Sequence, residues 1–171
     1  MESSKTVGII LLVIVILWTG SHIVSMLKDN IRITNTLTGF WSMADKTATI
    51  EKKSEYLDKY VDATEKHELN KGNSAVFFKH YDNDMANNYD ALRSLQKRLH
   101  EIKKMDIQSF AYQTALQQLT QQEWKEATAM TGQFYYKLVN KEFVFTWGWL
   151  GWLPWTIIVI FGVIGFMVLI A

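Results

Sequence analysis

Two long apolar runs without a charged side chain, one near each end, constrain this chain more than any other feature. The first extends from Val7 to Leu27 and the second from Trp152 to Ala171, and each has about 20 residues. At about 1.5 Å of rise per helical residue, either run crosses the roughly 30 Å hydrocarbon core of a bilayer. The sequence therefore predicts two membrane-spanning helices, at 7–27 and 153–171, with a short N-terminal tail at 1–6.

A cleaved signal peptide is the alternative for the N-terminal run, because Lys5 precedes an apolar core. The run is longer than a typical signal-peptide core, and no A-x-A cleavage pattern follows it. We therefore expect it to remain as a span of an integral, two-pass membrane protein.

The stretch FTWGWLGWLPW places four of the seven tryptophans next to the second span. Indole rings combine an apolar body with a polar N–H, and they sit favourably at the headgroup level. Gly148, Gly151 and Pro154 should interrupt the helix, so that the segment 143–152 lies along the membrane interface. The residues predicted to form this aromatic belt are Trp147, Trp149, Trp152 and Trp155.

Small residues in both spans predict close packing against other helices, either between the spans or with partner subunits. An ionisable side chain inside a span is costly, but His22 is about six residues from Lys28 and therefore near the interface. A hydrogen bond to a neighbouring helix is thus favoured over a proton relay. The residues predicted to pack in the membrane are Gly20, Ser21, His22, Ser25, Gly162 and Gly165.

The polar region 28–142 has no proline and only three glycines, which is typical of helices. Because the chain leaves the membrane and returns to it, the extramembrane helices should be even in number. We favour an all-α antiparallel bundle of four helices, with breaks near Gly72, Asp106 and Thr120. The alternative is a long helical hairpin with one bent return helix from Asp84 to Lys141.

Periodic apolar positions support these helices. The first should run from Asn30 to His67, continuing out of the first span. Asp106 can cap a third helix, and TQQE, at 120–123, has the spacing of a capping box for a fourth. The second helix carries a coiled-coil pattern formed by Met85, Leu92, Leu95, Leu99 and Ile102.

A loop at 70–84 joins the first two predicted helices, and turn residues there surround a short apolar run. We expect it at the end of the bundle far from the membrane, where a loop on a rigid scaffold is a plausible contact site. The residues predicted to contact a ligand or partner are Asn73, Phe77, Phe78, His80 and Tyr81.

Chemistry-bearing motifs are absent from the sequence: it has no cysteine, no G-x-S-x-G and no phosphate-binding glycine loop. His80, Asp82 and Asp84 come nearest to a metal site, but Asn87 and Arg93 stand where a calcium loop requires glycine and glutamate. His67 and His100 are expected to face water. The sequence thus predicts no catalytic, cofactor-binding or metal residues, no cofactor and no enzymatic activity.

Flanking charges and domain length give opposite predictions of topology. More Lys and Arg lie on the domain side of the spans than on the side of the termini, but the charge rule applies to loops shorter than about 60 residues. Since long domains translocate largely regardless of charge, we expect an extracytoplasmic bundle with cytoplasmic termini. A net charge of +1 gives no reason to expect nucleic acid.

Two packable spans, a helical stalk and no catalytic constellation predict a non-catalytic structural or accessory subunit of a larger membrane complex. Its partners would be lipid and either other membrane subunits or further copies of itself. The alternative is a sensor, because the layout resembles the input modules of bacterial chemoreceptors and sensor kinases. The resemblance is one of architecture, and it implies a bundle that binds a ligand or partner at the 70–84 tip and signals through a partner's helices.

Overall fold

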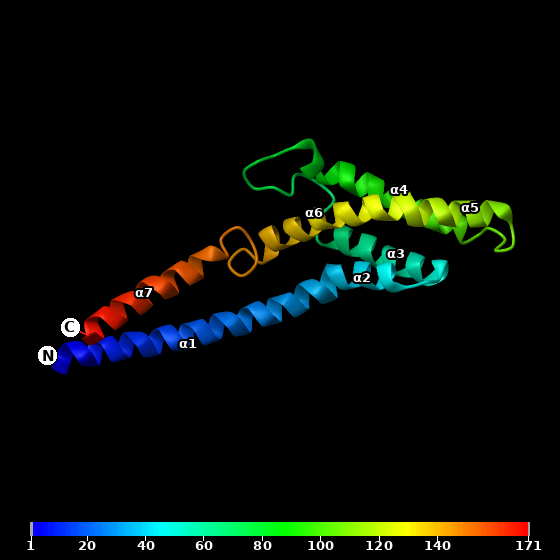
Figure 1. Cartoon of the computed structure of the whole chain (residues 1–171). Helices are drawn as coiled ribbons and strands as arrows, with labels where there is room; N and C mark the ends of the chain where they lie inside the picture. Colours follow the sequence, from blue (N-terminus) through cyan, green and yellow to red (C-terminus); the bar gives the residue numbers. More distant parts are fainter. Residues whose placement is uncertain (1, 171) are drawn as a thin grey trace. The chain divides into compact units, whose positions relative to one another are not determined.

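The structure is a computed structural model that describes residues 2–170, except for the side chains of residues 2–4, 120 and 121 (Figure 1). Over this range the chain is helical and has no β-strand, which confirms the predicted all-α class. The chain divides into two compact units. One consists of its two ends, up to Ile31 and from Lys141, and the other is Arg32–Asn140.

The first unit contains the two apolar helices, α1 (Glu2–Ile33) and α7 (Trp152–Ile170). Both are long and apolar enough to cross a membrane, as predicted from the sequence. Only 11% of each apolar stretch is buried, whereas a core helix of a water-soluble domain would be mostly buried.

Two glycines mark the place where α1 and α7 approach each other most tightly. A Cβ atom built on Gly8 would lie 3.1 Å from the carbonyl oxygen of Gly165 and 3.2 Å from the backbone nitrogen of Leu169. A Cβ on Gly165 would lie 3.2 Å from Cβ of Leu11. Gly8 was not among the residues predicted to pack, because its neighbours Val7 and Ile9 gave no small-residue pattern.

Turns connect α6 to α7 between residues 143 and 151, as the glycines there predict. Gly151 is needed for close approach, since a Cβ atom on it would lie 3.0 Å from the carbonyl oxygen of Thr146. The Thr146 hydroxyl donates a hydrogen bond of 2.9 Å to Asp29 on α1. The turn is thereby tied to the first apolar helix within this unit.

The second unit begins where α1 passes through a π-helical turn, η1 (Thr34–Thr38), into α2 (Gly39–Lys46). The chain then turns at 47–49 before α3 (Ile50–Lys66). The predicted continuous helix from Asn30 to His67 is therefore wrong. Ala48 is exposed in this turn.

After the loop 67–84, which contains the short 3₁₀ turn η2 (Tyr81–Asn83), the chain forms α4 (Met85–Ile102). The side chain of Asp84 caps α4 by accepting hydrogen bonds from the backbone N–H groups of Ala86 and Asn87. All five apolar residues of the predicted heptad pattern in α4 are buried.

The return to the first unit is one helix with an internal π turn: α5 (Phe110–Gln118), η3 (Leu119–Glu123) and α6 (Trp124–Glu142). The predicted break near Thr120 is wrong, because the backbone stays helical there. The capping bonds predicted for the Thr120 side chain lie outside the described residues. The hairpin alternative is also wrong, because a turn at 103–109 interrupts the helix that it required.

Ser109, not Asp106, caps the start of α5, because its side chain accepts a hydrogen bond from the backbone N–H of Tyr112. Asp106 instead stabilises the preceding turn by accepting from the N–H of Gln108 at 3.1 Å. Ile107 and Phe110 are 58% and 87% exposed, and Ala111 is exposed as well.

The core of the second unit lies where α2, α3, α4 and α6 meet. Its fully buried side chains include Leu37, Leu57, Tyr60, Leu99 and Phe134. The rings of Tyr60 on α3 and Phe134 on α6 make an edge-to-face contact with a centroid distance of 6.1 Å. This contact joins the second helix of the unit to the last.

The loop 67–84 is pinned to the C-terminal part of α6. Lys137 donates to the carbonyl oxygen of Asn73 at 3.1 Å, and the Asn140 side chain donates to that of Ser74 at 3.4 Å. The chain continues from Asn140 directly into the turns before α7. The loop 67–84 is therefore held near the C-terminal end of α6.

Candidate binding cavity

The predicted aromatic belt is partly exposed and partly packed on α1. Trp147, Trp149, Trp152 and Trp155 are each between 38% and 59% exposed. The Trp147 indole N–H donates to the carbonyl oxygen of Met26 at 3.3 Å. The Trp155 ring meets the His22 ring edge to face, with a centroid distance of 5.2 Å.

The small residues predicted to pack divide into two groups. Gly165 lies at the crossing of α1 and α7, and a Cβ atom on Gly162 would be 3.9 Å from the Val15 side chain. A Cβ atom on Gly20 would meet nothing within 4 Å. Beside Gly20, Ser21 and Ser25 are exposed, while His22 is buried and its Nε2 atom has no hydrogen-bond partner among the described residues.

Of the residues predicted to form a contact site in the loop 70–84, Asn73 makes hydrogen bonds within the loop, whereas the aromatic residues are exposed. The Asn73 side chain accepts from the N–H of Ala75 at 2.9 Å and donates to the carbonyl oxygen of His80 at 3.5 Å. Phe77, Phe78 and Tyr81 are 70%, 79% and 80% exposed. Among the described residues, no three His, Asp or Glu side chains gather closely enough to hold a metal ion, and those at 80, 82 and 84 are no exception.

A stack of aromatic rings joins α2 to α6 inside the second unit. The Trp41 and Trp124 rings are nearly parallel, with centroids 4.6 Å apart. The Trp124 indole N–H donates to Asp45 at 2.8 Å, and the Lys53 ammonium lies 3.8 Å from the Trp124 ring centroid. Burial lowers the pKa of Lys53, and the nearby Asp45 carboxylate partly opposes this shift.

A cavity of about 210 Å³ lies beside this stack, between α3 and α6 and the end of η1. Among its walls are Trp41, Tyr60, Tyr135 and Tyr136, and a Cβ atom built on Gly132 would meet nothing within 4 Å. A cavity of about 150 Å³ accommodates benzene in a model protein, so this one can hold a molecule the size of a phenol or an indole. The full lining comprises Thr38, Trp41, Tyr60, Thr131, Gly132, Tyr135 and Tyr136.

Two of the lining side chains carry buried polar atoms without a partner. Tyr60 is 1% and Trp41 is 8% exposed, yet the Tyr60 hydroxyl and the Trp41 indole N–H have no hydrogen-bond partner among the described residues. Leaving such a group unpaired in a protein interior costs about 1–3 kcal/mol. Burial also raises the pKa of Tyr60 far above its usual range, so the phenol stays neutral and can donate.

The walls of the cavity are aromatic and polar, and their side chains carry no charge. The side chains around the cavity supply aromatic surface, hydroxyl groups and one indole N–H, and they include neither a carboxylate nor an imidazole. Burial raises the pKa of Tyr135 as well, which keeps a second phenol neutral. The cavity therefore suits an uncharged molecule that offers a hydrogen-bond acceptor and an apolar body.

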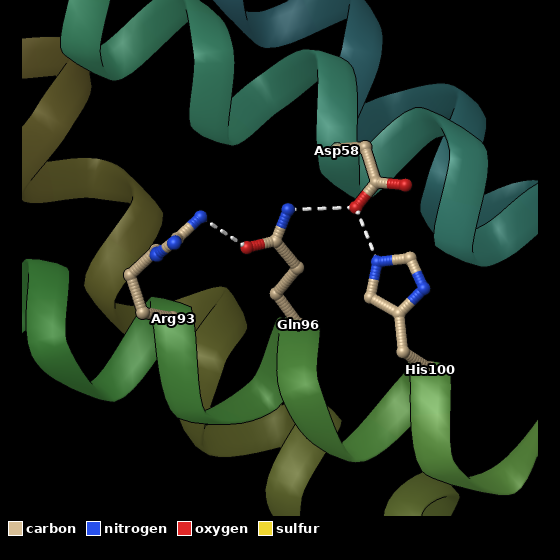
Figure 2. A network of polar contacts seen from close by, with 4 residues as sticks. All are labelled: Asp58, Arg93, Gln96 and His100. Carbon is tan, nitrogen blue, oxygen red and sulfur yellow. Dashed lines mark hydrogen bonds and ion pairs between the residues drawn. The ribbon is translucent and has the colours of Figure 1, made fainter.

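A polar network on the other side of α3 joins it to α4 (Figure 2). The Asp58 carboxylate accepts from the Gln96 side chain at 2.7 Å and lies 2.9 Å from Nε2 of His100. Arg93 donates to the Gln96 carbonyl oxygen at 2.7 Å. His100 is therefore paired with a carboxylate, while its side chain is 43% exposed and faces water as expected.

Comparison of the chain with protein-family models, with curated proteins and with solved structures found no match. The function of the cavity therefore has to follow from its own geometry.

Sequence reasoning missed this cavity because its walls come from distant parts of the chain. Trp41, Tyr60 and the adjacent Tyr135 and Tyr136 were not singled out from the sequence. The combination of two tyrosines with Gly132 on one helix was the available signal. These residues line a cavity only because α3 lies beside α6, which the sequence does not show.

Proposed function

We propose that this protein is a non-catalytic, two-pass membrane protein whose helical unit binds a small uncharged ligand in the aromatic cavity. The observation that carries the proposal is the pair of buried polar atoms without partners, the Trp41 N–H and the Tyr60 hydroxyl. Once a side-chain shift exposes these atoms to the cavity, a ligand with an acceptor oxygen would pair them and recover their desolvation cost. This function fits the sensor hypothesis, with the ligand in the cavity instead of at the 70–84 tip.

We also infer that the helices of residues 32–140 form an antiparallel bundle. Its segments are 32–46, 50–66, 85–102 and 110–140, and the aromatic contacts of Trp41 and Tyr60 join the first two to the last. Such a bundle would provide rigid walls, which reduce the entropy lost when a ligand is ordered on binding.

The test compares phenol with toluene, two probes of similar size that differ in their hydroxyl group. In the full chain in mild detergent, phenol should raise the melting temperature more than toluene does, and calorimetry should show tighter binding. Tyr60→Phe should remove about 1–2 kcal/mol of this preference, which is roughly a 5- to 30-fold change in relative affinity.

Tyr81→Phe is the matched control, because it removes a hydroxyl from a tyrosine that is 80% exposed and lies outside the cavity. It should leave the binding of both probes unchanged. Equal stabilisation by phenol and toluene, unaffected by Tyr60→Phe, would show that the unpaired atoms do not form a ligand site.

A second candidate function is that of an accessory subunit, in which α1 packs against a partner helix. It is favoured by the open side of Gly20, by the exposed Ser21 and Ser25, and by the buried Nε2 of His22. Close contact between helices in lipid depends on such small residues.

Extraction in mild detergent should then yield a stoichiometric partner or a homo-oligomer, and Gly20→Leu should release it. Ile16→Leu is the control, since this residue is already 68% exposed on α1. A single monodisperse monomer in both the wild-type protein and the Gly20→Leu variant would rule out this function.

We further propose that the helical unit is extracytoplasmic and that both termini are cytoplasmic. The chain has no cysteine, so a cysteine placed at the exposed Lys71 can be labelled selectively in intact cells. A membrane-impermeant thiol reagent should react with it without lysis. If the cysteine is labelled only after lysis, the helical unit is cytoplasmic and the proposed topology is wrong.

A further inference from the structure

We propose that the loop between α3 and α4 inserts its aromatic tip, Phe77, Phe78 and Tyr81, into the headgroup region of the bilayer that α1 and α7 cross. This inference does not depend on a ligand in the cavity. The three rings are 70%, 79% and 80% exposed, and Val76 beside them is 41% exposed.

The loop has a closed neck that holds its tip in place. The backbone N–H of Ser74 donates to the carbonyl oxygen of Asn83 at 2.9 Å, and that of Met85 donates to Gly72 at 2.9 Å. Gly72 has a positive φ of 76°, which a glycine adopts without strain. The neck therefore presents residues 75–82 as one projecting unit.

Helix α6 fixes the position of this neck. The Ser74 hydroxyl is 2.5 Å from the Gln133 side-chain oxygen, and Lys137 and Asn140 bind the carbonyl oxygens of Asn73 and Ser74. The Ser74 side chain is itself buried. The tip is thereby held at the C-terminal end of α6.

The covalent chain limits the distance between this end of α6 and the tryptophan-rich turns. An extended chain covers at most about 3.6 Å per residue, so Asn140 lies within about 11 Å of Phe143, where the tryptophan-rich turns begin. By the same limit, Trp147 is within about 25 Å of Asn140. Because the Ser74–Asn83 bond closes the loop, its farthest residue, Phe78, is four residues from Ser74 and lies at most about 14 Å from it, which is enough to cover the distance from Asn140 to Phe143.

The chemistry of the tip fits a lipid interface. Aromatic side chains are favoured at the headgroup level, and exposed clusters of large apolar residues in water mark interaction surfaces. Lys79, directly after Phe78, is exposed and can pair with anionic headgroups. Of the two nearby carboxylates, Asp84 is engaged in capping α4, while Asp82 stays exposed at the neck.

Single cysteines carrying an environment-sensitive fluorophore test this inference, because the natural chain has no cysteine. The full chain is reconstituted into vesicles of three parts phosphatidylcholine to one part phosphatidylglycerol, with and without spin-labelled phosphatidylcholine. The label at Phe78→Cys should be blue-shifted and strongly quenched by the spin-labelled lipid.

Phe110→Cys is the matched control, because this phenylalanine is 87% exposed but lies at the other end of the same helical run. Its 30-residue separation from Asn140 corresponds to about 45 Å of helix. Quenching at position 78 should exceed that at position 110 several-fold. Equal quenching at the two positions would overturn the inference.

Two further outcomes are informative. A blue shift at position 78 without lipid quenching would indicate a protein contact and would also overturn the inference. A label at Tyr81→Cys should lose its quenching when Phe77→Ser and Phe78→Ser are introduced together. Because those two side chains are exposed, the melting temperature of the chain should not change, and retained quenching at position 81 would exclude insertion through these rings.

Discussion

The crossing of α1 with α7 and the core of the helical unit are packed by opposite means. The two apolar helices meet at Gly8 and Gly165, where the absence of side chains lets the backbones approach. The helical unit is instead held by large rings, such as the stacked Trp41 and Trp124 and the buried Phe134. In lipid, apolar side chains gain little by leaving one apolar surface for another, so close backbone contact decides the packing. In water, burial of large rings supplies most of the driving force.

The difference also explains where imperfect packing is tolerated. Large, irregular rings leave a cavity of about 210 Å³ in the helical unit and two polar atoms without partners. Five substitutions would test this contrast, and they are given in order of decreasing effect.

Phe134→Ala should have the largest effect. This side chain is fully buried, and truncating a buried phenylalanine costs about 3–5 kcal/mol of unfolding free energy. Denaturant unfolding in mild detergent, followed by circular dichroism, measures the loss. Phe110→Ala, at an 87% exposed position, should change stability by less than about 0.5 kcal/mol. Similar losses in the two variants would mean that burial of rings does not hold this unit.

Gly8→Leu should separate α1 from α7, because overpacking a tight contact costs about 1–3 kcal/mol. Spin labels on cysteines at the exposed positions Ile10 and Met167 would report a longer and broader distance distribution. Gly20→Leu should leave that distribution unchanged, since a Cβ atom on Gly20 meets nothing within 4 Å. A change of equal size in both variants would refute a crossing at Gly8.

Gly39→Ala and Gly132→Ala should change stability in opposite directions. A Cβ atom on Gly39 would lie 2.5 Å from the carbonyl oxygen of Thr34 in the π turn, so the overpacking cost should exceed the gain in helix propensity by about 1–2 kcal/mol. Gly132 has open space, so alanine there should stabilise by about 0.5–1 kcal/mol and narrow the cavity. The same denaturant unfolding assay measures both changes in stability. Stabilisation by Gly39→Ala would show that the π turn does not pack tightly around position 39.

Tyr60→Phe should have the smallest effect on the ligand-free protein. Removing a buried hydroxyl without a partner costs nothing and can stabilise by up to about 1 kcal/mol. A melting temperature equal to or above that of the wild-type protein is expected, together with weaker phenol binding. A clear destabilisation would show that the hydroxyl already has a partner, such as an ordered water.

The predictable parts of this fold are those set by local chemistry. The lengths of the two apolar runs predicted helices able to cross a membrane, and Gly148, Gly151 and Pro154 predicted the turns before α7. The heptad of α4 predicted its buried face, since residues such as Leu92 and Leu99 share one side of a helix whatever it packs against. The proposed functions, the partners and the topology remain predictions.

Errors arose where local patterns were ambiguous. Thr47 and Thr49 have ordinary helix propensities, so the turn between them was not foreseen. TQQE has the spacing of a capping box, but packing of Trp124 against Trp41 favours a continuous helix with a π turn there. His100 gained a carboxylate partner because α3 brings Asp58 beside it.

The sequence by itself determined the type of each main element and the two helices that suit a bilayer, because hydropathy and periodicity act over neighbouring residues. Only the tertiary structure decided which glycines touch, where the 70–84 loop is held and that Trp41, Tyr60 and Tyr135 surround one cavity. Each of these depends on how helices distant in the chain are rotated against each other. That rotation is set by the sum of many weak contacts, and no local pattern encodes it.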